Sequence, residues 1–155
     1  IQQLYQVDGT GNDYRWSAWY TYNDVAKDWK LDKLTDSYVL NNNEYSRPAG
    51  QIRGINMIRL SEMYLIAIES APTQNEANAL YIPYMKARNV DASPLQQEQL
   101  MTEIIREYRR EFFGEGQMFY TYKRLGIKNM LWKTDREVGE QDYVVPLPST
   151  ELTAN

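Results

Sequence analysis

The feature that most constrains the fold is a change in the spacing of apolar residues near residue 57. From there onward, apolar side chains recur at intervals of three, four and seven, which is the spacing of one helix face. The pattern predicts helices over residues 58–70, over a stretch that opens at Thr73 or Gln74, over residues 94–113 and over residues 117–125. The sequence therefore predicts a mainly α protein, built of helix hairpins with little strand.

Prolines and glycines predict where these helices begin and end. Pro72 should stop the first helix, and Pro83 should kink or split the second, because proline lacks the backbone N–H and clashes with the preceding turn. Ser93 is the expected N-cap of the third helix, with Pro94 at its first position. Gly126 is the expected end of the last helix.

Nine large side chains on the predicted helix faces are expected to pack the helices together. They are Leu60, Tyr64, Ile68, Leu80, Ile104, Ile105, Tyr108, Phe112 and Phe119. Their spacing places them on the inner faces of successive helices.

Residues 1–56 lack a sustained helical period and are rich in Asn, Asp, Gly, Tyr and Trp. Alternation predicts one strand over residues 15–22, and residues 28–34 fit a short strand or a turn of helix. Asn, Pro and Gly predict a loop over residues 41–50. We expect residues 1–56 to form a loop-rich segment and residues 57–155 a helical region, both belonging to a piece of one larger domain.

Composition argues against several classes of function. The chain has 155 residues, a formal net charge of -4 and no Lys/Arg-rich block, so the electrostatic footprint of a nucleic-acid binder is missing. It has no cysteine and no histidine, which removes thiolate chemistry, the commonest general base and the commonest metal ligand. We expect no cofactor, no metal site and no enzymatic activity.

Glu111 and Glu115 are spaced as catalytic carboxylates would be on one helix face. Arg109 and Arg110 lie beside them, and Gly114 interrupts the helix between them. A neighbouring arginine lowers the pKa of a carboxyl, which is the wrong direction for a general acid. The sequence favours structural ion pairing at a helix junction over catalysis.

An aromatic cluster in the loop-rich segment is the candidate ligand site. Its rings are Trp16, Trp19, Tyr20, Tyr22 and Trp29, and its polar neighbours include Asn12, Asp13, Arg15, Asn23 and Asp24. Indole and phenol rings stack on the C–H faces of sugars, while amides and charged groups bond the hydroxyls. The alternative is that the rings pack the loops onto the helices, because large aromatic residues are mostly buried.

Four motifs in order resemble the C-terminal part of the SusD/RagB family. The first is IRLSEMYLIAIES, from Ile58 to Ser70, and the second is YMKAR, which ends at Arg88. The third is the stretch EYRREFFGEGQMFYTYKR, which matches the family through Glu107, Arg109, Glu111, Glu115, Gly116 and Arg124. The fourth is VVPLPSTELTAN at the end of the chain. The upstream NDYR, residues 12–15, resembles a further Asp-x-Arg element of the family.

This resemblance implies a tetratricopeptide-like helical scaffold and a non-catalytic role. The family consists of surface lipoproteins of Bacteroidetes that capture nutrients, usually glycans, for a TonB-dependent, SusC-like transporter in the outer membrane. It implies that membrane contact is made only through a lipid anchor outside this chain. Six residues would carry the structural motif: Arg59, Glu62, Arg109, Glu111, Glu115 and Arg124. Trp16, Trp19, Tyr20, Tyr22, Asn12 and Arg15 would contact an oligosaccharide or another nutrient such as a peptide. The alternative is a helical-repeat module that binds a protein and no sugar.

Overall fold

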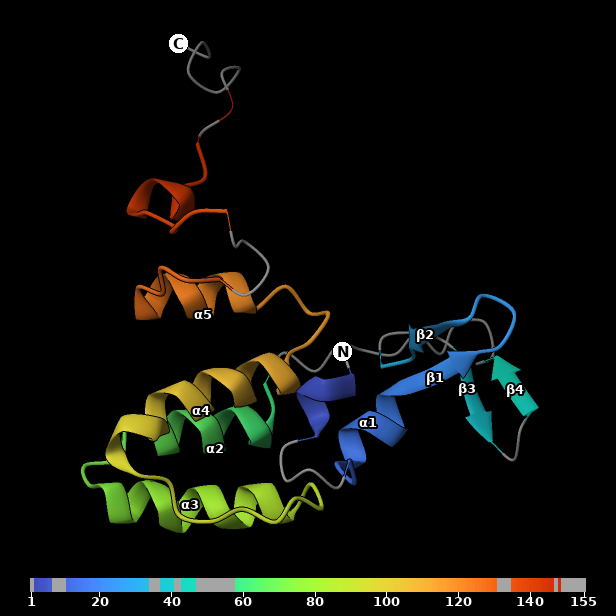
Figure 1. The fold of residues 1–155 in the computed structure, drawn as a ribbon, viewed down its shortest axis with the longest axis horizontal. Helices are drawn as coiled ribbons and strands as arrows, with labels where there is room; N and C mark the ends of the chain where they lie inside the picture. Colours follow the sequence, from blue (N-terminus) through green and yellow to red (C-terminus); the bar gives the residue numbers. More distant parts are fainter. Residues whose placement is uncertain are drawn as a thin grey trace. The chain divides into compact units, whose positions relative to one another are not determined.

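The computed structural model divides into two compact units, Ile1–Gly114 and Glu115–Asn155. It is mainly helical, as the sequence predicts, and its chain is traced in Figure 1. The described residues are 2–6, 11–33, 37–40, 43–46, 58–130, 135–146 and 148.

Three helices form the scaffold of the first unit. They are α2 (Leu60–Glu69), α3 (Gln74–Lys86) and α4 (Gln97–Glu111), and α2 packs against both of the others (Figure 1). Their core contains Leu65, Ile68, Ala77, Tyr81, Tyr84, Met85, Ile104, Tyr108 and Phe112, all at most 4% exposed. The helices form because these apolar positions recur at helical spacing and bury one face of each helix.

The predicted core is confirmed for Ile68, Ile104, Tyr108 and Phe112, which are buried. Tyr64, Leu80, Ile105 and Phe119 are half-buried. The prediction is wrong for Leu60, which is 75% exposed. Leu60 is the first residue of α2 and shares its outer face with Met63, whereas Leu65 and Ile68 occupy the inner face.

Helix α3 continues through Pro83, so of the two expected outcomes, a kink or a split, the split does not occur. Pro83 lies in the last turn, so its missing N–H removes one hydrogen bond close to the end of the helix. Its own carbonyl still accepts from the Ala87 N–H at 3.0 Å. The helix opens at Gln74 as predicted, with Thr73 as the N-cap: the Thr73 side chain accepts from the Glu76 N–H at 3.3 Å.

Replacing Thr73 with alanine should lower the free energy of unfolding by about 1 kcal/mol, because the first turn of α3 loses its capping acceptor. Chemical denaturation of the variant checks this value. Asn75→Ala, at an exposed position of the same turn, is the matched control and should change stability by less than about 0.5 kcal/mol. Equal losses in the two variants would contradict the capping role.

Helix α4 begins at Gln97 with Gln96 as its N-cap, rather than at Pro94 with Ser93 as the cap. The Asn78 side chain bonds the Leu95 backbone on both sides, accepting from its N–H at 2.8 Å and donating to its carbonyl at 3.0 Å. Gln74 donates to the same carbonyl at 2.8 Å. These contacts from α3 hold the backbone before α4 out of the helix, so the first turn starts later.

The N-terminal part of the first unit contains short elements. They are a 3₁₀ turn η1 (Gln2–Tyr5), the helix α1 (Tyr14–Trp19) and an antiparallel pair of strands, β1 (Tyr20–Asn23) and β2 (Asp28–Leu31). The single strand predicted over residues 15–22 is therefore wrong in its first half. The Asp13 side chain accepts from the Arg15 N–H at 2.9 Å and caps a helix there. Residues 28–34 fitted either a short strand or a turn of helix, and the structure shows the strand, β2.

A second strand pair follows, formed by β3 (Ser37–Leu40) and β4 (Asn43–Ser46) with Ser37 opposite Ser46. The loop predicted over residues 41–50 is thus wrong for β4. Tyr45, in the middle of this strand, has high strand propensity. Residues 41–42 and 47–50 of the predicted loop lie outside the described residues.

The second unit contains α5 (Met118–Leu125) and a 3₁₀ turn, η2 (Glu140–Tyr143). Its buried side chains are Thr121, Tyr122, Met130, Val138 and Tyr143. Gly126 ends α5 as predicted, with a positive φ of 62° that glycine adopts without steric cost. The Tyr143 hydroxyl donates to the Ile127 carbonyl at 2.5 Å and fastens η2 to the end of α5.

Candidate functional site

The candidate site begins at α1, a helix of only six residues whose one buried side chain is Arg15. The Arg15 guanidinium donates to both carboxylate oxygens of Asp13, with Nη2–Oδ2 at 2.7 Å and Nε–Oδ1 at 3.0 Å. Asp13 is 2% exposed and also caps α1 through the Arg15 N–H. The Asp13 carboxylate therefore caps the first turn of α1 and also holds the Arg15 side chain in place.

Arg15 reaches from α1 to Glu107 on α4, with Nη1–Oε2 at 2.8 Å. Glu107 is fully buried and also pairs with Arg110 on its own helix. Arg110 in turn pairs with Glu103, with Nη1–Oε1 at 2.7 Å. The result is a buried chain of alternating charges, in which each carboxylate lies between or beside guanidinium groups.

Glu111 extends this ion-pair cluster to Arg88, which follows the end of α3. Its Oε2 lies 3.1 Å from Arg88 Nη2 and 3.4 Å from Arg15 Nη1. The structural pairing predicted for Glu111 is confirmed by these contacts. Through these contacts, the Glu111 carboxylate is paired with two arginines.

The electrostatic environment keeps both central carboxyls ionised. Burial by itself raises the pKa of Glu107, but the charges and hydrogen bonds of Arg15 and Arg110 outweigh it and hold that pKa below its ordinary value of 4.5. Burial opposes ionisation of Glu111 as well, and there Arg88, a Ser61 hydrogen bond and Arg15 lower the pKa. A general acid needs a raised pKa, so neither carboxyl suits acid catalysis.

Further contacts attach the N-terminal part to the C-terminal end of α4. The Tyr5 hydroxyl donates to the Arg110 carbonyl at 3.1 Å, and the Arg110 Nε donates to the Leu4 carbonyl at 2.6 Å. The Lys33 ammonium donates to the Glu111 carbonyl and lies 3.8 Å from the Trp19 ring centroid. The last turn of α4 therefore receives contacts from η1, α1 and the segment after β2.

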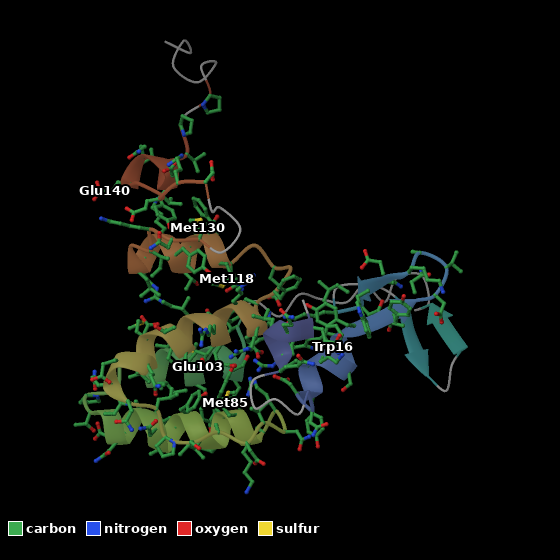
Figure 2. The ribbon with its side chains drawn as sticks, in the orientation of Figure 1. Trp16, Met85, Glu103, Met118, Met130 and Glu140 are labelled. Atoms are coloured by element: carbon green, nitrogen blue, oxygen red, sulfur yellow. The ribbon has the colours of Figure 1, made fainter. Side chains whose placement is uncertain are left out.

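The aromatic residues of α1 and the β1–β2 hairpin form one connected cluster of rings. Trp16 stacks on Tyr20 with centroids 4.8 Å apart and contacts Trp29 at 4.5 Å. Trp29 contacts Tyr22 at 5.2 Å, edge to face, and these two residues are register partners across the hairpin. Figure 2 shows Trp16 within this group of side chains. We call Trp16, Tyr20, Tyr22 and Trp29 the ring cluster.

The predicted ligand residues differ in how accessible they are. Arg15 and Tyr20 are buried, at 4% and 6% exposure, and Trp16 and Trp19 are half-buried. Tyr22 is 42% exposed and Asn12 is exposed as well. Trp29 is 38% exposed, so the hairpin presents a pair of adjacent rings to solvent.

The other residues of the expected structural motif lie at several places. The Arg59 guanidinium lies 5.1 Å from the Phe112 ring centroid, and Glu62 is in the first turn of α2. Arg109 is half-buried on α4. Glu115 is half-buried and Arg124 is exposed, and both belong to the second unit.

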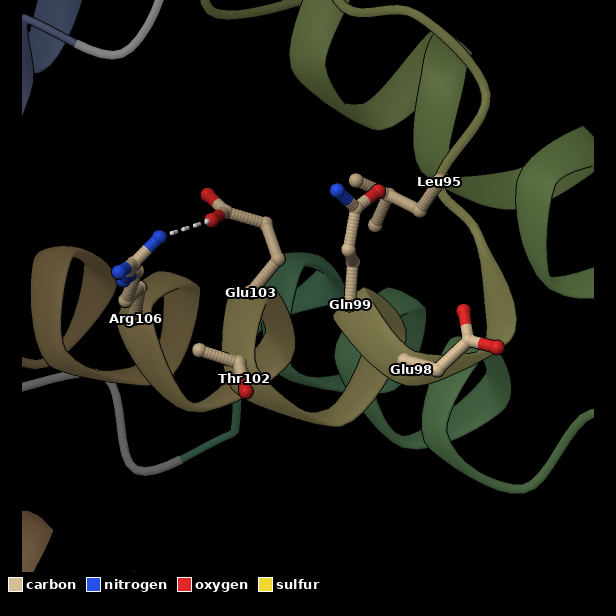
Figure 3. A pocket seen from close by; sticks show the side chains of 6 residues that line it. All are labelled: Leu95, Glu98, Gln99, Thr102, Glu103 and Arg106. Atoms are coloured by element: carbon tan, nitrogen blue, oxygen red, sulfur yellow. Dashed lines mark hydrogen bonds and ion pairs between the residues drawn. The ribbon is translucent and has the colours of Figure 1, made fainter.

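A shallow hollow of about 360 Å³ lies beside the first half of α4 (Figure 3). Its lining consists of Leu95, Glu98, Gln99, Thr102, Glu103 and Arg106. Glu103 is bound to Arg106 at 3.3 Å as well as to Arg110. Its ionisable lining is therefore largely engaged in ion pairs, and we assign no ligand to it.

Two further observations concern metal binding and membrane crossing. Among the described residues, no group of three or more acidic, histidine or cysteine side chains is placed to bind a metal ion. Within the same part of the chain, none of the helices has the length and apolar character needed to cross a lipid bilayer.

Comparison with known proteins gives one result. The model of the SusD family matches residues 6–154, almost the whole chain. No match is found among curated proteins or among solved structures. The chain belongs to the SusD family. Proteins of this family are generally non-catalytic, nutrient-binding lipoproteins of the outer-membrane surface.

Sequence reasoning missed Asp13 and Glu103 as members of the ion-pair cluster, and it assigned Arg15 to the ligand site. A signal was present, because Glu103, Glu107 and Arg110 are spaced by four and three and therefore share one helix face. That face lies next to the one that buries Ile104 and Tyr108. Charged residues so close to an apolar face are as consistent with buried ion pairs as with a solvated surface.

Proposed function

We propose that this chain is part of a glycan-capture protein at the cell surface, which delivers its ligand to a TonB-dependent, SusC-like transporter of the outer membrane. Membership of the SusD family supports nutrient binding in general. We further propose that residues 1–56 and 57–155 belong to one larger domain with a tetratricopeptide-like scaffold. Its lipid anchor would lie outside this chain.

The observation that carries the ligand proposal is the exposed ring pair Tyr22–Trp29. These rings leave apolar area in water although Trp16 packs against Trp29 from within the ring cluster, and such exposure is often retained for contact with a partner. Asp24 and Asp28 are exposed and lie within two residues of the pair in sequence, and we propose that their carboxylates accept hydrogen bonds from the hydroxyl groups of the ligand. The two rings are packed edge to face, so the face of a single ring is the apolar surface that a sugar ring would contact.

Trp29→Ala in the full-length protein should weaken glycan binding about 5- to 10-fold, since an aromatic contact contributes roughly 1 kcal/mol. Binding is measured by affinity gel electrophoresis against soluble starch, dextran, arabinoxylan and laminarin. Tyr120→Ala is the matched control, because this ring is 70% exposed on α5 in the second unit. Equal effects of the two substitutions, or retained affinity in Trp29→Ala, would reject the ring pair as the contact.

The second candidate function is a helical-repeat module that binds a protein and no sugar. The exposed apolar side chains of α2 favour it, since Leu60, Met63 and Ile66 are 75%, 46% and 46% exposed. Co-purification of the full-length protein from outer membranes separates the two functions. Recovery of a TonB-dependent transporter together with polysaccharide binding supports capture and delivery, whereas recovery of another protein without polysaccharide binding supports the module.

A further inference from the structure

The helix that carries Trp16 and Trp19 is held to the scaffold by polar groups. Helix α1 is too short to be stable by itself in water, so tertiary contacts must maintain it. Arg15 is its one buried residue, and the Tyr14 N–H donates to the Arg88 carbonyl at 3.0 Å. Just before the helix, the Asn89 side chain donates to the Asn12 carbonyl at 3.1 Å.

Contacts of this kind fix an orientation as well as a position. A guanidinium group is planar, and its N–H groups point in set directions, so pairing with two carboxylates defines the rotation of the group that carries it. Arg15 is paired with Asp13 on one side and with Glu107 on the other. An apolar side chain in its place would fill the space but leave α1 free to roll about its axis.

The roll of α1 matters because Trp16 is the next residue. Its ring is 4.5 Å from Trp29 and 4.8 Å from Tyr20. Trp29 in turn contacts Tyr22, the other exposed ring of the hairpin. A rotation of α1 would move Trp16 and remove the support behind Trp29.

We propose that Arg15 is a positioning residue for the ligand surface: its pairing with Asp13 and Glu107 sets the orientation of Trp16, which supports the exposed Trp29–Tyr22 pair. Arg15 itself is buried, so in this proposal it acts through Trp16 and not by contact with the ligand. The affinity part of this proposal rests on the proposed glycan binding. The orientation of the rings is measured without any ligand.

Other attachments should keep the variant protein folded. Lys33 donates to the Glu111 carbonyl. Between η1 and α4, the Tyr5 hydroxyl donates to the Arg110 carbonyl and the Arg110 side chain donates to the Leu4 carbonyl. Arg15→Met should therefore reorient α1 and leave the helical scaffold intact. Arg15→Lys keeps the positive charge without the planar fork and should rescue part of the effect.

The test compares the two Arg15 variants with Glu103→Gln in the full-length protein. Glu103→Gln removes two ion pairs from the same cluster, and the partners it loses are Arg106 and Arg110 on α4 rather than a residue of α1. Near-ultraviolet circular dichroism and acrylamide quenching of tryptophan fluorescence report the ring packing. Denaturation reports stability, and affinity electrophoresis on the polysaccharides used above reports binding.

Arg15→Met should change the aromatic dichroism and increase quenching, with unchanged far-ultraviolet dichroism and about tenfold weaker polysaccharide binding. Arg15→Lys should lie between this variant and the unmodified protein. Glu103→Gln should be less stable but should keep the ring signals and the affinity. If Arg15→Met does not fold, the proposal is judged on Arg15→Lys, which must show the same changes at reduced size.

Unchanged aromatic dichroism and quenching in the folded Arg15 variants would overturn the proposal. The same changes in Glu103→Gln would also overturn it, because they would then follow from lost stability alone. If the ring signals change as expected but the unmodified protein binds none of the polysaccharides, the positioning role stands and the glycan proposal fails.

Discussion

Replacing Glu107 with glutamine should lower the free energy of unfolding by about 3–5 kcal/mol, because removing one carboxylate from a buried ion-pair cluster leaves an excess of positive charge inside the protein. Glu107 is 0% exposed, and it lies between Arg15 and Arg110, which are 4% and 5% exposed. Both guanidinium groups would lose their shared carboxylate at once. Denaturation in urea at neutral pH measures the loss.

Glu98→Gln is the matched control, since Glu98 is an exposed residue on the same helix. It should change the free energy of unfolding by less than about 0.5 kcal/mol. A loss below about 1 kcal/mol in Glu107→Gln would contradict the role of this carboxylate as the centre of the cluster.

Acid should destabilise the protein more steeply than its exposed carboxylates alone would predict. The pKa values of Glu107 and Glu111 lie below the ordinary value of 4.5 when the protein is folded. The folded state therefore binds fewer protons than the unfolded chain as pH falls below 4.5. The stabilisation is fully present above that pH and is lost as pH falls towards the folded-state pKa values, at up to about 1.4 kcal/mol per pH unit for each carboxylate.

Urea denaturation at intervals between pH 8 and pH 3 measures this dependence. The curve should be nearly flat between about pH 5.5 and 8, because the chain contains no histidine to titrate there. Below pH 4.5, Glu107→Gln should show a shallower slope than the unmodified protein. An identical slope in the two proteins would mean that Glu107 contributes nothing to the acid transition.

The helices were predictable because apolar spacing and local capping carry most of the information about them. Thr73 and Gly126 act at the helix ends where the sequence places them. The start of α4 was not predictable, because it is decided by Asn78, which bonds the Leu95 backbone from another helix. A contact between residues 17 positions apart leaves no trace in local propensity.

The candidate site was predictable in its residue types and less so in the role of each residue. The sequence pointed to the rings near Trp16, but burial differs widely among them, from Tyr20 at 6% to Tyr22 at 42%. Arg15 was expected to contact ligand, and the structure places its guanidinium inside an ion-pair cluster with Glu107. Arg15 can be buried because it pairs with Glu107, 92 positions away in the sequence. The spacing of residues along the chain does not reveal such a pair.

The shared partners within the ion-pair cluster have an evolutionary consequence. Glu107 pairs with Arg15 and Arg110, and Glu111 pairs with Arg15 and Arg88, so a change at either carboxylate alters the charge balance at two arginines at once. The effects of substitutions at such positions do not add, because each depends on what occupies the others. A related sequence that lacks Arg15 should therefore also differ at Glu107 or Asp13, and these positions should change together or not at all.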